Sequence, residues 1–159
     1  LITVLIISLF SPLTLIEFGF QQNTISLALS FIDLITVIIL IYSLIYIHEI
    51  IHLIFIPGFL HSDKTFLGLT WFGGYAYTED EITKERYLLI GCMPFFLISV
   101  LFVVILGSTG NLTPVMKLMC IVNALGSSVD FFNNLLVLKQ VPDRSKIVMN
   151  GPLTYYKVV

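Results

Sequence analysis

Four long blocks of apolar residues, separated by shorter polar stretches, dominate the chain. They cover residues 1–16, 25–56, 87–106 and 114–138. A helix needs about 20 residues to cross a hydrocarbon core of about 30 Å. The last three blocks reach that length, and the first reaches it if it extends to Phe20. The pattern therefore predicts an all-α membrane protein with about four transmembrane helices, in which Pro12 and Pro94 bend the first and the third.

The long polar connection between the second and third blocks carries its own pattern. Residues 66–77 are rich in aromatic side chains and contain Gly73 and Gly74, which is typical of a short β-hairpin or of a loop that lies on the membrane. Thr78 and Glu81 have the spacing of a capping box, which predicts that a helix begins at Thr78.

The last segment, residues 139–159, is soluble in character. Two short runs on either side of Asn150-Gly151 predict a second hairpin, although Pro152 follows this pair directly. We therefore divide the chain into a membrane-embedded core, residues 1–138, and a C-terminal tail, residues 139–159.

Composition and charge support a membrane location and an orientation. Hydrophobic residues make up 57% of the 159 and charged residues 11%, against about a quarter charged in a soluble domain. The net charge of −2 and the lack of a basic stretch give no support to nucleic-acid binding. Seven of the eight Lys and Arg residues gather in the long loop and the tail, whereas Lys117 lies near the opposite side, and the positive-inside rule then places the loop and the tail in the cytoplasm. The seven residues are Lys64, Lys84, Arg86, Lys139, Arg144, Lys146 and Lys157.

The second apolar block contains the sequence His48-Glu49-Ile50-Ile51-His52. Residues four apart share one face of a helix, so His48 and His52 can bind one metal ion while Glu49 stands beside them. Polar groups at membrane depth are costly without a partner, and Zn²⁺ is the partner that this spacing indicates. The alternative is that the two histidines join helices through hydrogen bonds and that Glu49 bonds to a neighbour.

A catalytic zinc site usually has three protein ligands, so a third is expected. Asp130 lies eight residues before the end of its block, as His48 does in its own, and at about 1.5 Å per residue both reach a similar depth. Asp130 is therefore the predicted third ligand, and it shares a helix face with Asn123 and Ser127. Its alternative role is to orient an imidazole N–H. The other candidate ligands are His61, Glu17, Glu79, Asp80, Glu81 and Glu85.

These parts predict peptide hydrolysis. Zinc lowers the pKa of a bound water toward about 7 and polarises the scissile carbonyl. Glu49 takes the water's proton and passes it to the leaving amine, and Asn123 is a candidate contact of the tetrahedral oxyanion. The substrate must be extended, and residues 66–77 either pair with it as an added strand or form a packed aromatic loop.

A histidine motif in one membrane helix, with Asn123, Gly126 and Asp130 in a later one, resembles the site-2-protease type of intramembrane zinc metalloprotease. The chain is more similar still to the putative zincin peptidase family of small bacterial membrane proteins. That similarity covers roughly residues 34–150 and includes Pro94 and the Gly-Ser-x-x-Asp element that ends at Asp130. One departure from the site-2 pattern is that Phe131, and not Gly, follows Asp130.

The resemblance implies roles for particular residues. His48, His52 and Asp130 would bind zinc, Glu49 would be catalytic, and Asn123 would contact the substrate or the oxyanion. It also implies a protein of a bacterial cell membrane, and the positive-inside rule places the active site of this multi-pass protein toward the cytoplasm.

Two readings of the function stay open at this point. The first is an intramembrane zinc metalloprotease that cleaves a membrane-associated protein or peptide. The second is a membrane protein that binds a metal without proteolysis, as a sensor or transporter subunit, or a catalytically inactive partner protein. Glu49 favours the protease, because a pure binding site does not need a general base.

Overall fold

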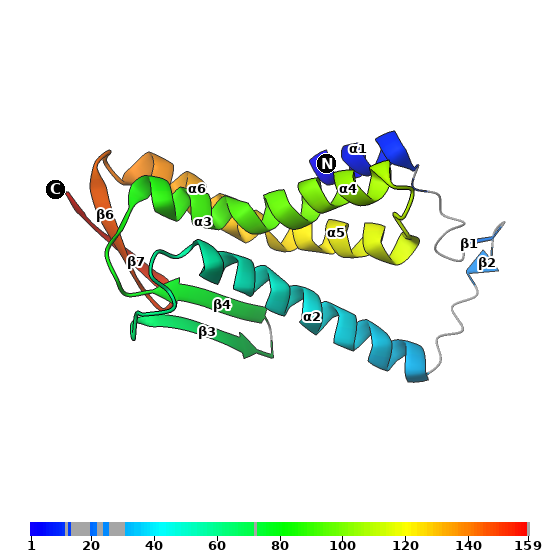
Figure 1. Ribbon diagram of the computed structural model, residues 1–159, viewed down its shortest axis with the longest axis horizontal. Helices are drawn as coiled ribbons and strands as arrows, with labels where there is room; N and C mark the ends of the chain where they lie inside the picture. Colours follow the sequence, from blue (N-terminus) through cyan, green and yellow to red (C-terminus); the bar gives the residue numbers. More distant parts are fainter. Residues whose placement is uncertain (12, 14–19, 22–23, 26–30, 72, 159) are drawn as a thin grey trace.

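The computed structural model describes residues 1–11, 13, 20–21, 24–25, 31–71 and 73–158. The helical elements in order are α1 (Ile2–Phe10), α2 (Phe31–Phe55), α3 (Lys84–Pro94), the π-helical segment η2 (Phe95–Leu101), α4 (Phe102–Ser108), α5 (Pro114–Gly126) and α6 (Ser128–Gln140). The strands are β1 (Phe20–Gln21), β2 (Thr24–Ile25), β3 (Thr65–Thr70), β4 (Gly73–Thr78), β5 (Ile82–Thr83), β6 (Ser145–Asn150) and β7 (Leu153–Val158). Figure 1 shows long helices with the larger strands gathered at one end.

In the described part of the chain, three helical stretches are long and apolar enough to cross a membrane. They are Phe31–Phe55, Lys84–Ser108 and Pro114–Gln140, so three of the four predicted spans are found, and the predicted first span is not shown. The nine residues of α1 extend only about 13 Å, and Phe20 belongs to β1 and not to a longer first helix. Pro12 and Glu17 lie outside the described residues.

The second span is shorter than its apolar block. Ile25 lies in β2, and the helix begins at Phe31, so the predicted start at residue 25 is wrong. None of the most apolar part of α2 is buried inside the protein, and Figure 1 shows α2 running at an angle to α4 and α5. A bare apolar helix surface is stable where lipid, and not water, is its solvent.

The third span begins later than the capping-box pattern predicts. Thr83 caps the helix through its Oγ1 atom, which accepts a bond from the N–H of Arg86 at 3.2 Å. Thr78 instead accepts a bond from the N–H of Asp80 at 3.1 Å, within a turn. Where a bend is expected at Pro94, the structure has the π-helical segment η2 directly after it.

The loop and the tail each form the predicted hairpin, so the all-α description is incomplete. β3 pairs with β4, and β6 pairs with β7. Gly151 has a φ of +57° and is the first of the two turn residues between Asn150 and Leu153. Pro152 is the second, where a type II′ turn has the negative φ that proline prefers. Strand β5 from the loop then pairs with β6 from the tail.

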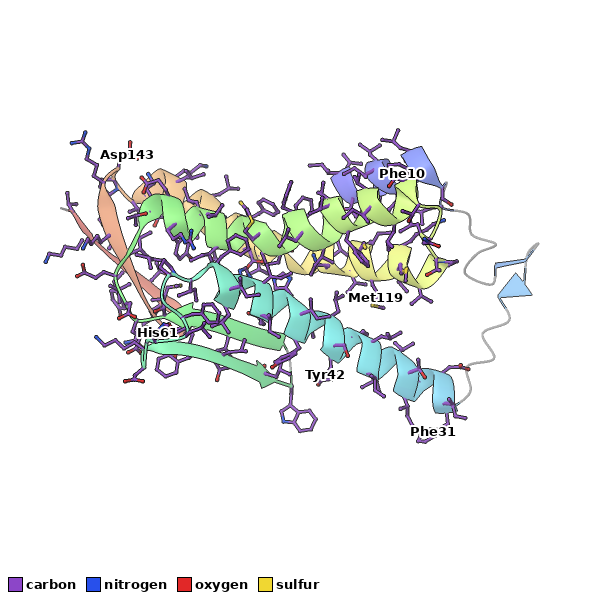
Figure 2. All side chains as sticks on the ribbon, in the orientation of Figure 1. Phe10, Phe31, Tyr42, His61, Met119 and Asp143 are labelled. Atoms are coloured by element: carbon purple, nitrogen blue, oxygen red, sulfur yellow. The ribbon has the colours of Figure 1, made fainter. Side chains whose placement is uncertain are left out.

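The β3–β4 hairpin lies along the C-terminal half of α2. The Tyr42 hydroxyl donates to the Trp71 carbonyl at the hairpin tip, with an O···O distance of 3.4 Å, and Figure 2 shows Tyr42 partway along α2. Tyr42 is 13 residues from Phe55, or about 20 Å along the helix. The hairpin therefore runs beside the part of α2 that carries His48 and Glu49.

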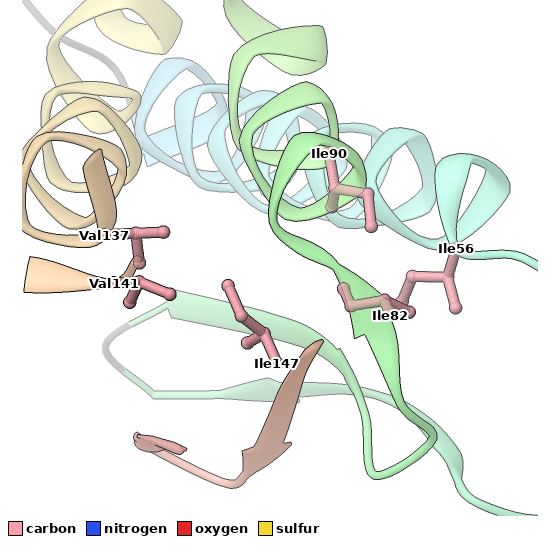
Figure 3. Close-up of a cluster of buried hydrophobic side chains, with 6 residues drawn as sticks. All are labelled: Ile56, Ile82, Ile90, Val137, Val141 and Ile147. Carbon is pink, nitrogen blue, oxygen red and sulfur yellow. The ribbon is translucent and has the colours of Figure 1, made fainter. Parts of the chain in front are cut away.

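A buried apolar cluster holds the ends of the three long helices together. It joins residues from α2's end, β5, α3, α6 and β6 (Figure 3). Its members are Ile56, Ile82, Ile90, Val137, Val141 and Ile147. Burial of each such side chain contributes about 1.5–3 kcal/mol. The cluster fixes the register between α2, α3 and α6, and Ile90 links it to the site described next.

Candidate metal centre

His48 and His52 meet on one face of α2, as their spacing predicts. Their ring centroids are 4.8 Å apart, and the two Nε2 atoms are 3.1 Å apart. His52 is buried and only 7% exposed. The helical period of 3.6 residues is sufficient to produce this arrangement.

Asp130, the third residue of α6, completes the group. Its Oδ2 lies 3.2 Å from His48 Nε2 and 3.6 Å from His52 Nε2. The three potential ligand atoms lie within 4.8 Å of one another. Within the described ranges no other set of three or more His, Cys, Asp or Glu side chains could hold a metal ion.

The other candidate ligands of the loop have different partners or positions. Glu81 accepts a bond from Lys146 at 2.9 Å, which lowers the pKa of the Glu81 carboxyl below its usual value. Asp80 is hydrogen-bonded to the Ser62 hydroxyl. Figure 2 shows His61 at the end of the molecule where the loop lies, close to β3. Glu17 lies outside the described residues.

Hydrogen bonds to the other ring nitrogens fix the orientation of both imidazoles. The Nδ1 atom of His48 lies 2.9 Å from Asn123 Oδ1, and that of His52 lies 2.9 Å from the Ile90 carbonyl oxygen. Both oxygens are acceptors, so each Nδ1 carries a hydrogen, and in a neutral ring each Nε2 then has a free lone pair. Partners of this kind orient the histidine ligands of metal sites.

When both rings are neutral, the two Nε2 lone pairs and the Asp130 Oδ2 atom face one another with no hydrogen between them. Two imidazole nitrogens and a carboxylate oxygen at such short separations repel each other, and a divalent cation bound between them would remove that repulsion. Nitrogen and oxygen donors of this kind suit Zn²⁺. The residues present thus fit the ion that the sequence indicates.

Asn123 is buried behind His48 and fully hydrogen-bonded. Its Nδ2 donates to the Pro94 carbonyl at 3.2 Å and to Ser99 Oγ at 2.9 Å. These bonds identify Oδ1 as the atom that faces His48. The sequence indicates that Asn123 lies near the site, but not that both amide hydrogens are used inside the protein.

The partner of His52 is missing from the sequence-based prediction. Ile90 contributes a backbone oxygen, and backbone groups leave no trace in residue types. One signal was present, because Pro94 stands four residues after Ile90 and cannot donate the usual helical hydrogen bond to its carbonyl.

Glu49 lies beside the three ligand atoms, against the β3–β4 hairpin. A Cβ atom placed on Gly74 would lie 2.3 Å from Glu49 Cγ. Only glycine allows strand β4 to pass this close to the carboxylate side chain. The hairpin therefore forms one wall around Glu49.

Two cavities meet at the centre, and Glu49, Gly74 and Asp130 line both. The first, of about 550 Å³, is bounded by β4, α3, α6 and the tail turn, including Tyr87 and Pro152. The second, of about 640 Å³, lies between α2 and α5 and is largely apolar. An extended chain lying in both cavities would pass Glu49.

Comparison with known proteins identifies the family. The model of a family described as putative zincin peptidase matches residues 41–146, about two thirds of the chain. The match spans His48, His52, Asn123 and Asp130 and indicates a zinc-dependent metallopeptidase. Searches of curated proteins and of solved structures gave no match. On the strength of the family match, which contains all residues of the candidate metal centre, the chain belongs to the putative zincin peptidase family.

Proposed function

We propose that this protein is an intramembrane zinc metallopeptidase of the HExxH type. One observation carries the proposal: three possible ligand atoms from His48, His52 and Asp130 converge beside Glu49 at the junction of two cavities. A metal sensor or transporter subunit would need the ligands but not a carboxylate beside them in a cavity large enough for a peptide.

The residues divide the hydrolysis between them. Zinc, when bound by His48, His52 and Asp130, supplies Lewis-acid polarisation of the carbonyl and of the attacking water. Glu49 accepts one proton from the water as its oxygen bonds to the carbonyl carbon. Glu49 then returns this proton to the amide nitrogen as the C–N bond breaks, which gives a carboxylic acid and an amine. The backbone of Gly74 packs against the Glu49 side chain and keeps its carboxylate where it can both accept the proton from water and return it to the amide nitrogen.

The substrate we propose is an extended segment of a membrane-associated protein or peptide. Thr70 and Gly73 close a two-residue turn and so form a hydrogen-bonded pair. Hydrogen-bonded and non-hydrogen-bonded pairs alternate along an antiparallel hairpin, so Gly74 and Ala76 belong to non-hydrogen-bonded pairs. Their N–H and C=O groups therefore point away from β3, and both residues line the first cavity. A substrate strand could pair with this edge.

The two cavities differ in a way that supports a substrate at the membrane surface. The apolar second cavity suits substrate residues from the bilayer, while the first is bounded by the loop and the tail. We propose a bacterial cell membrane as the location, with the site toward the cytoplasm, because the basic residues of the chain are concentrated in these two segments.

We propose that Asn123 orients His48 and does not contact the oxyanion, since both of its amide hydrogens are already donated. Asn123→Ala is then expected to weaken zinc binding about 10–100-fold, as loss of an orienting partner does in other metal sites. Competition with a chromophoric chelator measures this. Asn111→Ala, in the turn before α5, is the matched control. Unchanged zinc affinity with reduced turnover would support the oxyanion role instead.

The purified protein in proteoliposomes tests the function directly. We expect one zinc per chain and cleavage of bonds in a mixture of peptides and single-span reporter proteins, identified by mass spectrometry. Removal of zinc with a chelator should abolish cleavage, and zinc should restore it. Zinc binding without any cleavage would favour a metal-binding membrane protein. Absence of zinc after its addition would contradict both readings and leave histidines that join helices.

A further inference from the structure

Pro94 stands in the interior of a long helical span, where proline is normally unfavourable. It is fully buried, and α3 continues through η2 into α4 around it. Proline has no N–H, so the carbonyl four residues earlier, that of Ile90, loses its usual helical donor. The next N–H, that of Phe95, bonds to the Cys92 carbonyl. The Ile90 oxygen is thus free to accept the 2.9 Å bond from His52 Nδ1.

The same stretch of α3 and η2 also supports His48, by a separate route. The Pro94 carbonyl and Ser99 Oγ both accept bonds from Asn123 Nδ2. Ser99 Oγ in turn donates to the Cys120 carbonyl at 2.9 Å. The amide of Asn123 is therefore held with its Oδ1 toward His48 Nδ1. In a regular helix the carbonyl of residue 94 would face the N–H of residue 98, whereas the π-helical segment changes this pattern.

We infer that Pro94 is a positioning residue for the metal centre, which acts by releasing one backbone carbonyl to His52 and presenting another to Asn123. Both imidazoles are then held as the tautomer that has its lone pair on Nε2, directed at Asp130. The inference rests on the proposed zinc site but not on peptidase activity. It also explains why an unfavourable residue occupies this buried helical position.

Pro94→Ala tests the inference because stability and metal binding should change in opposite directions. The alanine N–H can bond to the Ile90 carbonyl, so the thermal midpoint of the metal-free protein should rise by about 2–4 °C. The same bond competes with His52, so zinc affinity should fall about 10-fold or more. Pro114→Ala is the matched control, because Pro114 is the first residue of α5, where no helical N–H bond is lost.

A spectroscopic measurement distinguishes positioning from packing. In ¹⁵N-histidine spectra of the metal-free protein, His52 should show one tautomer in wild type and in Pro94→Ala should become a mixture. Ser99→Ala removes one acceptor of the Asn123 amide and should weaken zinc binding. In this variant the tautomer of His48 should become a mixture, while the tautomer of His52 should stay as in wild type.

Unchanged zinc affinity and an unchanged His52 tautomer in Pro94→Ala would overturn the inference. A fall of both the thermal midpoint and the zinc affinity in Pro94→Ala would also overturn it, because the proline would then act through packing alone. None of these measurements uses a peptide substrate, so a wild-type protein that binds zinc without cleaving peptides would contradict the proposed function and leave this inference standing.

Discussion

Glu49→Gln is expected to lower the turnover number about 10²–10⁴-fold, the usual contribution of a general base. Glutamine has the shape of glutamate, so its contact with Gly74 is kept, but its amide cannot take the proton of the attacking water. Zinc content should stay at the wild-type value because Glu49 is outside the group of three ligand atoms. Single-turnover cleavage of a peptide identified with the wild-type protein, together with metal analysis, measures both quantities.

The control for this prediction is Glu85→Gln, which changes a carboxylate in the first turn of α3 that lines neither cavity. Its turnover should equal that of the wild type. Full activity in Glu49→Gln would remove the general base from the proposed mechanism, while loss of zinc in that variant would make Glu49 a ligand.

Asp130→Ala is expected to reduce zinc affinity by more than 100-fold, beyond the 10–100-fold typical of residues that only orient a ligand. It removes one of three donor atoms and leaves two histidines, fewer than the three protein ligands of usual catalytic sites. Zinc content after dialysis and a chelator competition measure the loss. Asp63→Ala, a carboxylate of the exposed loop, should retain full zinc content.

Retention of zinc in Asp130→Ala would assign Asp130 the orienting role and return attention to the loop residues as ligands. Asp130→Asn adds a second measurement, because it preserves the shape of the side chain. Weak binding in both variants would establish that the carboxylate charge, and not merely its packing, holds the ion.

The residues of the candidate metal centre could be predicted from the sequence because the regular geometry of a helix turns sequence spacing into spatial position. The period of 3.6 residues brings His48 and His52 to one face, and the rise of 1.5 Å per residue aligns Asp130 with them across two helices. The depth comparison counts from the C-terminal ends of the helices, and the predicted ends at residues 56 and 138 lie within two residues of the observed ends at Phe55 and Gln140. The grouping of these three side chains therefore follows from the sequence with little further information.

The remaining features depend on contacts that carry no periodic signal. Strand β5 has only two residues, and it exists because β6, more than 60 residues later, pairs with it. Thr83 competes with Thr78 as a helix cap, and only tertiary context decides between them. Ile90 accepts the bond from His52 through its backbone carbonyl oxygen. Every amino acid type has this oxygen, so the residue type at position 90 does not indicate the bond. These are the points at which the predicted description was incomplete or wrong.

The distance along the chain between the ligands has a consequence for biosynthesis. His48 and Asp130 are 82 residues apart, so at 5–20 residues per second the ribosome adds Asp130 about 4–16 s after His48. During this interval the nascent chain has two histidines and Glu49 but no complete site. A peptidase that uses the proposed site would therefore stay inactive until the helix that carries Asp130 has been synthesised, and neighbouring nascent membrane proteins would not be exposed to a partly assembled site.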